Sequence, residues 1–332
     1  MRVFVTGGAG YVGSACLRLL LAESHDAIAY DNLYKGHREA VPAGRLVVGD
    51  LHDTAAMTKA MREHGSDAVM HFAAATDVGE SVTNPDYHYG NNIGGTLSLL
   101  RAMREAGVRR MLFSSTCATY GDNPKPPMDE LAAQIPCSPY ARTKLGVEWL
   151  IRDFAQAYGL GYTLLRYFNA AGADADGQFG EDHQPEFHLI PLVLQVPLGK
   201  RDKIYLFGDD YPTPDGTCIR DYVHTADLAA AHLLAIAATT EQTAEVYNIG
   251  TGYGHSVKQV HAACEAVTGC KIPYEIVARR PGDAPALVAD PSKLKTKLGW
   301  TPTYIDIRST IRTAWVWHQR YPDGYSNKAA HN

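Results

Sequence analysis

Short runs of β-branched and other apolar residues alternate with longer amphipathic stretches through the first half of the chain. Six apolar runs predict β-strands, at residues 3–6, 27–30, 46–48, 68–72, 111–114 and 163–167. Four stretches between them predict helices, at residues 15–22, 55–63, 96–105 and 141–157. Such alternation is typical of βαβ units, whose parallel strands form one sheet with helices on both faces. The pattern therefore predicts an α/β fold with a doubly wound parallel sheet.

The pattern changes after Gly172. Residues 173–218 are richer in Asp, Gly and Pro, with short strand-like runs such as 204–207. A helical run at 226–238 and a strand-like run at 246–249 then indicate a return to the first layer. We therefore expect a large domain and a smaller domain of mixed α/β structure. Their expected extents are 1–172 plus about 219–250 for the large domain, 173–218 plus about 251–320 for the smaller one, and 321–332 for a polar tail.

The composition is that of a globular enzyme and excludes several other classes. The 332 residues are 45% hydrophobic and 20% charged, and a net charge of −5 without a basic stripe argues against a nucleic-acid partner. No apolar run approaches the roughly 18 residues of a membrane span, and the first residues already form a predicted strand rather than a signal peptide. The six scattered cysteines show no metal-ligand spacing. We therefore expect reduced thiols, a cytoplasmic location and no metal site.

A glycine-rich motif lies between the first predicted strand and the first predicted helix. Gly7, Gly10 and Gly13 have the spacing G-x-x-G-x-x-G. Residues without a Cβ allow a tight turn and let the backbone approach a pyrophosphate, which then lies at the helix N-terminus. A glycine turn that only packs the helix on the strand is the alternative. The position of the motif favours a Rossmann-type nucleotide-binding domain.

Two acidic residues follow the second and third predicted strands. Asp31 lies 18 residues after Gly13, where a carboxylate can accept both hydroxyls of an adenosine ribose. It would repel a 2′-phosphate, and although Lys35 and Arg38 lie nearby, the balance favours NAD over NADP. Asp50 is placed for the adenine, or equally for capping the end of its strand.

Tyr140 and Lys144 begin a predicted helix after Pro139, and their spacing of four residues places them on one helix face. A free tyrosine has a pKa of about 10 and is a poor base at neutral pH. A lysine charge and a positive nicotinamide would favour the phenolate, and a pKa of about 7 would require roughly 4 kcal/mol. The Y-x-x-x-K spacing is common by chance. However, hydroxyls at 114–116 end a predicted strand, where parallel sheets bind ligands.

Specific motifs occur in order along almost the whole chain. They are Thr6-Gly-Gly-Ala-Gly-Tyr-Val-Gly13, Asp31-Asn-Leu33, His71-Phe-Ala-Ala74, Ser114-Ser-Thr-Cys-Ala-Thr-Tyr-Gly121, Tyr140 to Lys144, Arg166-Tyr-Phe-Asn169, Phe207-Gly-Asp-Asp-Tyr211, Arg220-Asp-Tyr222 and Arg279-Arg-Pro-Gly-Asp283. With them the chain, over about residues 1–320, resembles the extended short-chain dehydrogenase/reductase family. Within that family it is similar to the UDP-galactose/UDP-glucose 4-epimerases, with UDP-arabinose 4-epimerases close behind.

The resemblance implies a role for each matching residue. Tyr140 would be the base, Lys144 would bind the nicotinamide ribose and lower the tyrosine pKa, and Thr116 would hydrogen-bond the reacting hydroxyl. The expected NAD-binding set is Gly7, Gly10, Tyr11, Val12, Gly13, Asp31, Asn32, Asp50, Leu51, Phe72, Ala73, Ala74, Asn91, Ser114, Tyr140, Lys144 and Tyr167. The expected UDP-sugar-binding set is Thr116, Tyr140, Asn169, His188, Leu189, Phe207, Arg220, Arg280, Asp283 and Leu287. Without the motifs, Phe207 could be a core residue and Arg220 could pair with Asp221 at the surface.

The implied reaction inverts C4 of a UDP-sugar. Tyr140 removes the 4-hydroxyl proton as hydride passes to NAD, the 4-keto sugar rotates, and hydride returns to its opposite face. A 4,6-dehydratase would carry an Asp-Glu pair after the threonine, where this chain has Cys117-Ala118. A UDP-arabinose/UDP-xylose 4-epimerase is the main alternative, because its catalytic groups would be the same. An NAD-binding regulator without turnover would not need the catalytic and UDP-binding residues together.

Thr76 bears on cofactor binding, His188 on substrate contact and Leu287 on specificity, and one pair of helices bears on assembly. Thr76 replaces a lysine that many of these enzymes carry near the nicotinamide, and His188 replaces a common asparagine. Leu287 takes the place of a residue that controls access for 2-N-acetyl groups, so we expect UDP-GlcNAc and UDP-GalNAc to be accepted as well. These enzymes commonly dimerise through two helices, here about 92–106 and 141–157, which predicts a homodimer.

Overall fold

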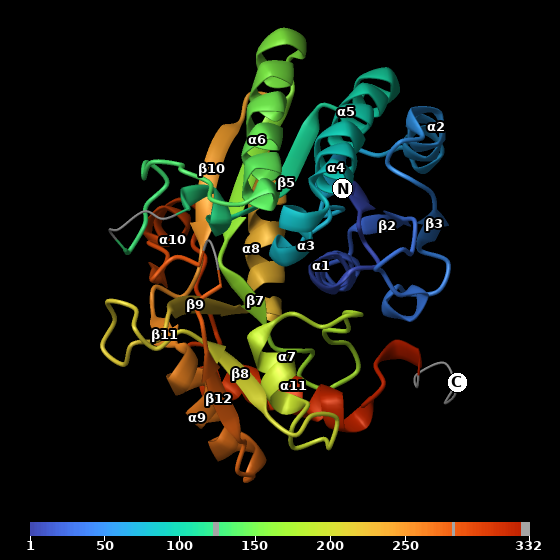
Figure 1. Ribbon diagram of the computed structural model, residues 1–332. Coiled ribbons are helices and arrows are strands. Elements are labelled where there is room, and N and C mark those ends of the chain that lie inside the picture. Colours follow the sequence, from blue (N-terminus) through green and yellow to red (C-terminus); the bar gives the residue numbers. More distant parts are fainter. Residues whose placement is uncertain (122–125, 281–282, 327–332) are drawn as a thin grey trace.

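The computed structural model describes residues 1–121, 126–280 and 283–326, and its main feature is one large parallel sheet (Figure 1). The described residues form seven parallel strands in the order β3-β2-β1-β4-β5-β6-β10. These strands are β1 (Arg2–Thr6), β2 (Asp26–Asp31), β3 (Leu46–Val48), β4 (Ala68–His71), β5 (Arg110–Thr116), β6 (Gly161–Tyr167) and β10 (Ala244–Ile249). The strand order reverses between β1 and β4, and ligands of such sheets bind at the carboxyl ends beside that point. The predicted Rossmann-type fold is confirmed.

Helices cover both faces of this sheet (Figure 1). Leu17 and Leu228 place α1 and α8 on one face, and Met57, Leu99 and Val147 place α2, α5 and α6 on the other. The helices of this part are α1 (Tyr11–Ala22), α2 (Thr54–His64), α3 (Val78–Thr83), α4 (Pro85–Tyr89), α5 (Gly95–Ala106), α6 (Pro139–Tyr158), α8 (Thr225–Ala238) and α10 (Ser292–Leu298). The four helices that the sequence predicts in the first half lie within α1, α2, α5 and α6.

Local sequence signals set the ends of the long helix α6. Ser138 is its N-cap and accepts a hydrogen bond from the backbone N–H of Ala141 at 3.2 Å. Pro139 occupies the first helical position, where its missing N–H costs nothing. Gly159 ends the helix with a φ of 70°, a left-handed conformation that glycine adopts without strain. This start places Tyr140 in the first turn, at the edge of the sheet where ligands bind.

A smaller unit packs below the carboxyl ends of the large sheet (Figure 1). Its core includes Leu206, Tyr222, Val260 and Ile311. Its strands are β7 (Asn169–Ala171), β8 (Ile204–Phe207), β9 (Ile219–His224), β11 (Gly254–Ser256), β12 (Tyr274–Val277) and β13 (Ala286–Leu287), and its helices are α7 (Leu189–Leu194), α9 (Val257–Thr268) and α11 (Ile307–Arg320). β9 pairs with β7, β11 and β13, whereas β8 pairs with β12 in a separate two-stranded sheet.

Two expected boundaries differ from the structure. β9 belongs to the smaller unit, so the return to the large sheet begins at α8 rather than near residue 219. At the start of the expected polar tail, Tyr321 and Tyr325 are buried against Trp317, and residues 327–332 lie outside the described part. Among the helices described, none has the length and apolar content needed to cross a membrane.

Candidate active site

The glycine motif forms the turn between β1 and α1. Gly7 has a φ of 71°, and a Cβ on Gly13 would lie 2.1 Å from the carbonyl oxygen of Gly7. Both positions therefore require glycine for the tight turn and for close packing of the helix. A Cβ on Gly10 would approach the same oxygen at 3.3 Å, and Gly10 is the N-cap of α1 without a side chain to cap it. Tyr11 and Val12 thus begin a helix whose first N–H groups fit a pyrophosphate.

Asp31 ends β2 beside this turn and is 8% exposed. Its carboxylate accepts hydrogen bonds from the backbone N–H groups of Ala9 at 3.0 Å and Leu33 at 2.9 Å. Burial raises the pKa of the Asp31 carboxyl, and these two N–H groups oppose the rise. Each bond uses a different oxygen, so both oxygens keep a lone pair for the hydroxyls of a ribose.

Asp50 follows β3, and its carboxylate caps the turn that begins at this residue. One oxygen accepts the backbone N–H of His52 at 2.9 Å, and the other accepts the side-chain amide of Asn32 at 2.9 Å. The structure thus shows the capping role of Asp50, while the adenine contacts of Asn32, Asp50 and the buried Leu51 stay predictions.

The segment after β4 lies directly against the glycine turn. The backbone N–H of Ala73 donates to the carbonyl oxygen of Thr6 at 3.2 Å, and a Cβ on Gly7 would lie 2.5 Å from the Ala73 nitrogen. Phe72 and Ala73 therefore lie beside the glycine motif at the carboxyl end of β4, and the cofactor contacts of Phe72, Ala73 and Ala74 stay predictions.

Asn91 lies in a π-helical turn (Gly90–Gly94), a feature often found at functional sites. Its side-chain amide donates to Oδ1 of Asn92 at 3.0 Å. Asn92 is buried and bonds both the backbone of Ala75 and the hydroxyl of Thr143 on α6. The sequence argument missed Asn92, which ties the cofactor groove to the helix that carries Tyr140.

The three predicted catalytic residues come together at the carboxyl end of β5. Tyr140 is 8% exposed, and its side chain hydrogen-bonds that of Thr116, the last residue of β5. Lys144 is 2% exposed, and its ammonium donates to the carbonyl oxygen of Ser114 at 2.8 Å. The Ser114 hydroxyl donates to the phenol oxygen of Tyr167 at 3.0 Å. The helix spacing and the strand end thus converge as the sequence predicts.

Burial is the largest influence on the pKa values of Tyr140 and Lys144. Burial raises the pKa of Tyr140 well above its usual value, and the hydrogen bond from Thr116 offsets this only in part. Burial also lowers the pKa of Lys144 from 10.5 to about 7, although the charge of Glu148 opposes the shift. The Lys144 ammonium lies over the ring of Phe113 at 4.8 Å. A lowering of the Tyr140 pKa by Lys144 and a positive nicotinamide therefore stays a prediction.

A buried ion pair supports this helix one turn beyond Lys144. Glu148 is fully buried and accepts hydrogen bonds from Nε and Nη2 of Arg166 at 2.9 and 2.6 Å. It also accepts the hydroxyl of Ser115 at 2.6 Å and the side-chain amide of Gln134 at 3.3 Å. The sequence argument missed this group, although Glu148 shares the helix face of Lys144 at a spacing of four residues.

Four predicted substrate residues meet in the smaller unit. The guanidinium of Arg280 lies 4.3 Å from the ring centroid of Phe207, and both Arg280 and Arg220 approach Asp283 at 3.5 Å. Phe207 is 36% exposed, so the alternative of a core residue is wrong. Arg220 does not pair with Asp221, which is buried and accepts other hydrogen bonds. An exposed aromatic ring beside two guanidinium groups can hold a base and a diphosphate.

The other predicted substrate residues lie on elements facing the same region. Asn169 begins β7 and pairs in register with Tyr222 of β9. His188 is the N-cap residue of α7, and Leu189 begins that helix. Leu287 is half-buried on β13, paired in register with Arg220, and packs on the cluster that contains Cys117, next to Thr116.

The fold and the site together define a class of enzyme. A glycine turn, an acidic residue at the end of β2 and a buried Tyr140–Lys144 pair indicate a dinucleotide-dependent enzyme of the short-chain dehydrogenase/reductase type. The NAD dependent epimerase/dehydratase family matches residues 3–250, and the chain belongs to that family.

Relatives resemble the chain over almost its full length. A UDP-glucose 4-epimerase of Halalkalibacterium halodurans is 47% identical over 99% of this chain and 98% of its own. The crystal structure of a UDP-glucose 4-epimerase from Brucella ovis in complex with NAD is 47% identical, with a TM-score of 0.91 over 95% of this chain and 97% of that one. The UDP-Glc/GlcNAc 4-epimerase of Campylobacter jejuni is 38% identical, with a TM-score of 0.83 over 96% and 99% of the two chains.

Proposed function

We propose that this chain interconverts UDP-glucose and UDP-galactose by inverting C4 through a transient 4-keto sugar. The observation that carries the proposal is the meeting of Tyr140, Thr116 and Lys144 where the glycine turn would place a nicotinamide. Relatives that cover almost the whole chain are named UDP-glucose 4-epimerases, so the pentose alternative is not favoured.

Each catalytic side chain has a distinct task in this reaction. NAD, when bound, supplies a hydride acceptor that is regenerated in every turnover. Tyr140 takes the proton of the 4-hydroxyl and later returns it. Thr116, whose side chain hydrogen-bonds that of Tyr140, orients the same 4-hydroxyl. Lys144 supplies positive charge one helical turn from the phenol. Together with the positive charge of the nicotinamide ring, this charge lowers the pKa of the phenol. The phenolate is therefore favoured mainly when cofactor is present.

The protein binds the substrate mainly through its nucleotide part. Phe207 would contact the uracil, and Arg220 and Arg280 would bind the diphosphate by charge-assisted hydrogen bonds. The sugar can then rotate, because Leu287 offers it an apolar and uncharged neighbour. We infer that a 2-N-acetyl group also fits beside Leu287, as the name of the Campylobacter jejuni relative states for that enzyme.

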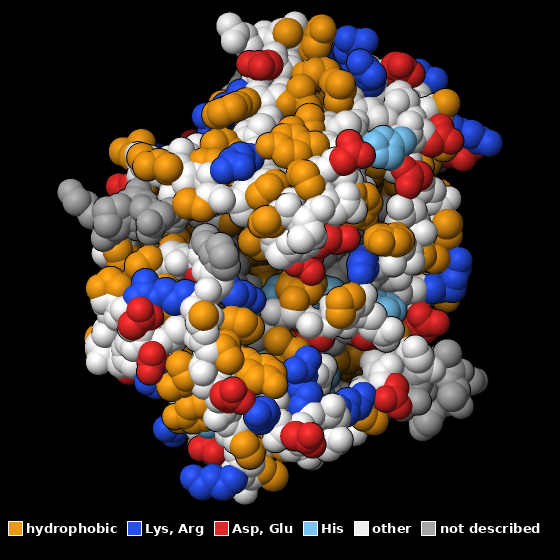
Figure 2. Space-filling view, viewed as in Figure 1, with side chains coloured by type: hydrophobic (Ala, Val, Ile, Leu, Met, Phe, Trp, Pro, Cys, Tyr) orange, Lys and Arg blue, Asp and Glu red, His pale blue; other side chains and the backbone are white. Residues whose placement is uncertain are grey.

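An exposed apolar surface supports the proposed homodimer. Figure 2 shows hydrophobic side chains gathered over α6, and Trp149 and Tyr158 of that helix are 58% and 49% exposed. Exposed large aromatic residues are enriched at protein interfaces relative to the rest of the surface. A cytoplasmic location accords with the six cysteines, all in the described part of the chain and all unpaired.

Turnover without added NAD tests the function. We expect purified protein to convert UDP-glucose to UDP-galactose, and Tyr140→Phe to reduce kcat by at least about 100-fold because it removes the acid–base group. Tyr274→Phe is the matched control, since Tyr274 lies exposed at the start of β12 and pairs with Ile204, at the opposite end of this strand pair from Phe207. Near-full activity of Tyr140→Phe would overturn the mechanism, and turnover of UDP-xylose in preference to UDP-glucose would favour the pentose alternative.

A further inference from the structure

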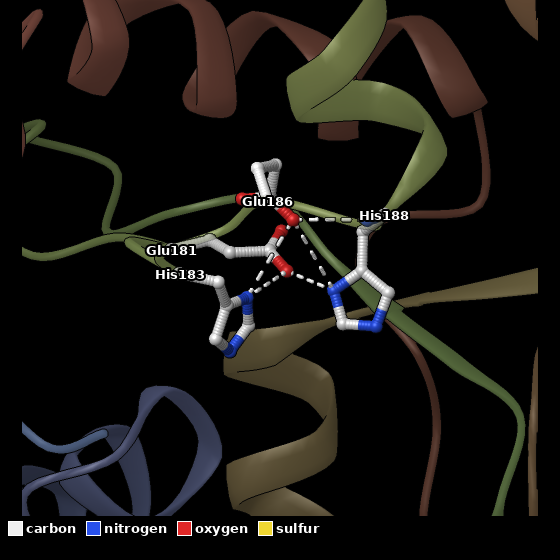
Figure 3. A group of neighbouring side chains, drawn as sticks. All are labelled: Glu181, His183, Glu186 and His188. Atoms are coloured by element: carbon white, nitrogen blue, oxygen red, sulfur yellow. Dashed lines mark hydrogen bonds and ion pairs between the residues drawn. The ribbon is translucent and has the colours of Figure 1, made fainter. Parts of the chain in front are cut away.

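Four potential metal ligands converge in the loop that leads into α7. They are Glu181, His183, Glu186 and His188, and their nearest ligand atoms all lie within 4.8 Å of one another (Figure 3). Glu181 and Glu186 are almost fully buried, whereas His183 and His188 are partly exposed. Figure 3 shows both imidazole rings directing Nδ1 toward the two carboxylates. The sequence argument against a metal considered cysteine spacing alone and therefore did not test this group.

The two distances from His183 to the carboxylates are close to those between ligands of one small cation. Bonds of about 2.0–2.2 Å to a tetrahedral zinc ion place neighbouring ligand atoms about 3.4 Å apart. Nδ1 of His183 lies 3.2 Å from Oε1 of Glu181 and 3.6 Å from Oε1 of Glu186. Nδ1 of His188 lies 4.0 Å from Oε1 of Glu186 and also contacts Glu181.

His183 gives an independent indication of a ligand. Its Nδ1 atom is buried and makes no hydrogen bond within the described residues, because the nearby carboxylate oxygens lie off the direction of a ring N–H. A buried polar atom without a hydrogen bond is costly and requires an explanation. A cation among the four groups would engage the His183 lone pair directly.

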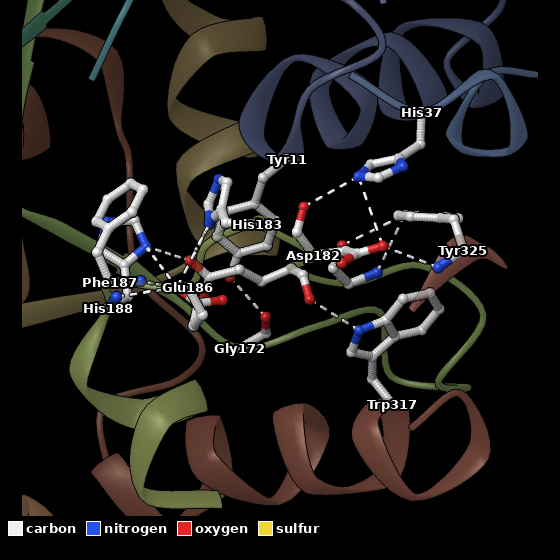
Figure 4. Close-up of polar contacts among 12 residues, drawn as sticks. Tyr11, His37, Gly172, Asp182, His183, Glu186, Phe187, His188, Trp317 and Tyr325 are labelled. Carbon is white, nitrogen blue, oxygen red and sulfur yellow. Dashed lines mark hydrogen bonds and ion pairs between the residues drawn. The ribbon is translucent and has the colours of Figure 1, made fainter. Parts of the chain in front are cut away.

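Surrounding groups hold the carboxylates in place, as the outer residues of a metal site do. Glu186 accepts the backbone N–H groups of Phe187 at 2.8 Å and His188 at 2.9 Å through one oxygen. The indole N–H of Trp317 donates to the carbonyl oxygen of Glu181 at 3.0 Å (Figure 4). The group is therefore anchored to α11 as well as to its own loop.

We propose that Glu181, His183, Glu186 and His188 bind one divalent transition-metal ion of the Zn²⁺ type. Two carboxylates and two neutral imidazoles neutralise its charge, and four protein ligands make the site structural rather than catalytic. Binding at Nδ1 leaves the proton of His188 on Nε2, so the metal would also fix that side chain as a hydrogen-bond donor at the entry to α7. His188 also belongs to the expected UDP-sugar-binding set, so the metal site would adjoin the proposed substrate site, and metal binding is therefore measured directly rather than through turnover.

Metal titration of the wild-type chain is the first test. Tag-free protein is stripped with a chelator and titrated with Co²⁺, whose visible absorption reports four-coordinate binding, and then with Zn²⁺. We expect saturation at one equivalent, displacement of Co²⁺ by Zn²⁺, and a rise in Tm of about 5 °C with excess Zn²⁺. Absence of saturable binding tighter than about 10 μM would show that the four residues form only ion pairs, which overturns the proposal.

Two variants locate the site. His183→Gln and Glu186→Gln each remove one ligand, and each should weaken Zn²⁺ binding at least about 10-fold and abolish the Co²⁺ spectrum. His37→Gln is the matched control: His37 contacts the carbonyl oxygen of Asp182 in the same loop at 3.0 Å but lies outside the four residues. Equal binding by His183→Gln and the wild type would place the metal elsewhere and overturn the assignment.

Discussion

The buried pair of Glu148 and Arg166 leads to a prediction about stability. Arg166 is 1% exposed, and its guanidinium makes two charge-assisted hydrogen bonds to Glu148. Glu148→Gln retains the shape of the side chain but removes the negative charge. One of the two oxygens then becomes an amide group that faces the Arg166 N–H groups. The variant therefore leaves a buried cation without a counter-charge.

The magnitude follows from the burial of both partners. Removing one partner of a buried ion pair costs about 3–5 kcal/mol, because the remaining charge keeps its desolvation cost and loses its attraction. The glutamine carbonyl can still accept one hydrogen bond from Arg166 or Ser115, which places Glu148→Gln near the lower end. At about 2 °C per kcal/mol for a chain of this size, the Tm should fall by about 6 °C.

Thermal unfolding at pH 7, followed by circular dichroism on NAD-free protein, measures this change. Glu63→Gln is the control, because Glu63 pairs with Lys59 at 3.8 Å on the exposed surface of α2 and should shift Tm by less than about 1 °C. The double variant Glu148→Gln with Arg166→Met removes the unpaired cation and should recover part of the loss. A Glu148→Gln protein that melts with the wild type would refute this account of the pair.

Three further predictions concern single side chains. Burial lowers the pKa of Lys144 from 10.5 to about 7. Between these two values the folded chain has lost this proton, whereas the unfolded chain still keeps it. As the pH increases over this range, the unfolding free energy of the wild type should therefore rise by about 1.4 kcal/mol per pH unit relative to that of Lys144→Met. A difference between the two proteins that does not change with pH in denaturant titrations would contradict this. Asp31→Asn should weaken NAD binding about 10- to 100-fold in fluorescence titrations, and an unchanged Kd would contradict the ribose contact. Leu287→Tyr should lower kcat/KM for UDP-GlcNAc at least about 10-fold more than for UDP-glucose, and equal effects would remove Leu287 from the sugar pocket.

The parts of the fold that sequence predicts well are those set by neighbouring residues. The apolar runs, the glycine spacing and the four-residue step from Tyr140 to Lys144 are local, and each leads to the observed element or turn. Asp31 could be placed at a strand end for the same reason. These features need only the geometry of one strand, one turn or one helix face.

Other features depend on contacts between distant segments. Glu148 and Arg166 lie on α6 and β6, and no periodicity shows that their side chains meet. The pairing of β9 with β7 likewise joins residues more than fifty positions apart, which moved the expected domain boundary. Tyr321 and Tyr325 belong to a segment that reads as polar, and their burial depends on Trp317 of α11. The pKa of Tyr140 could not be foreseen either, because it depends on how completely the site excludes water.

The last strand of the large sheet has a consequence for how this chain can be divided. Figure 1 shows β10, in orange, beside the green strands of the first half, and β10 pairs with β6 over six residues. A fragment that ended at residue 172 would leave β6 with a row of unpaired backbone groups and would lose α8 from the face of α1. Unprotected strand edges of this kind promote aggregation. During synthesis the nucleotide-binding half therefore stays incomplete until residue 249 has left the ribosome, and it cannot be excised as a continuous piece.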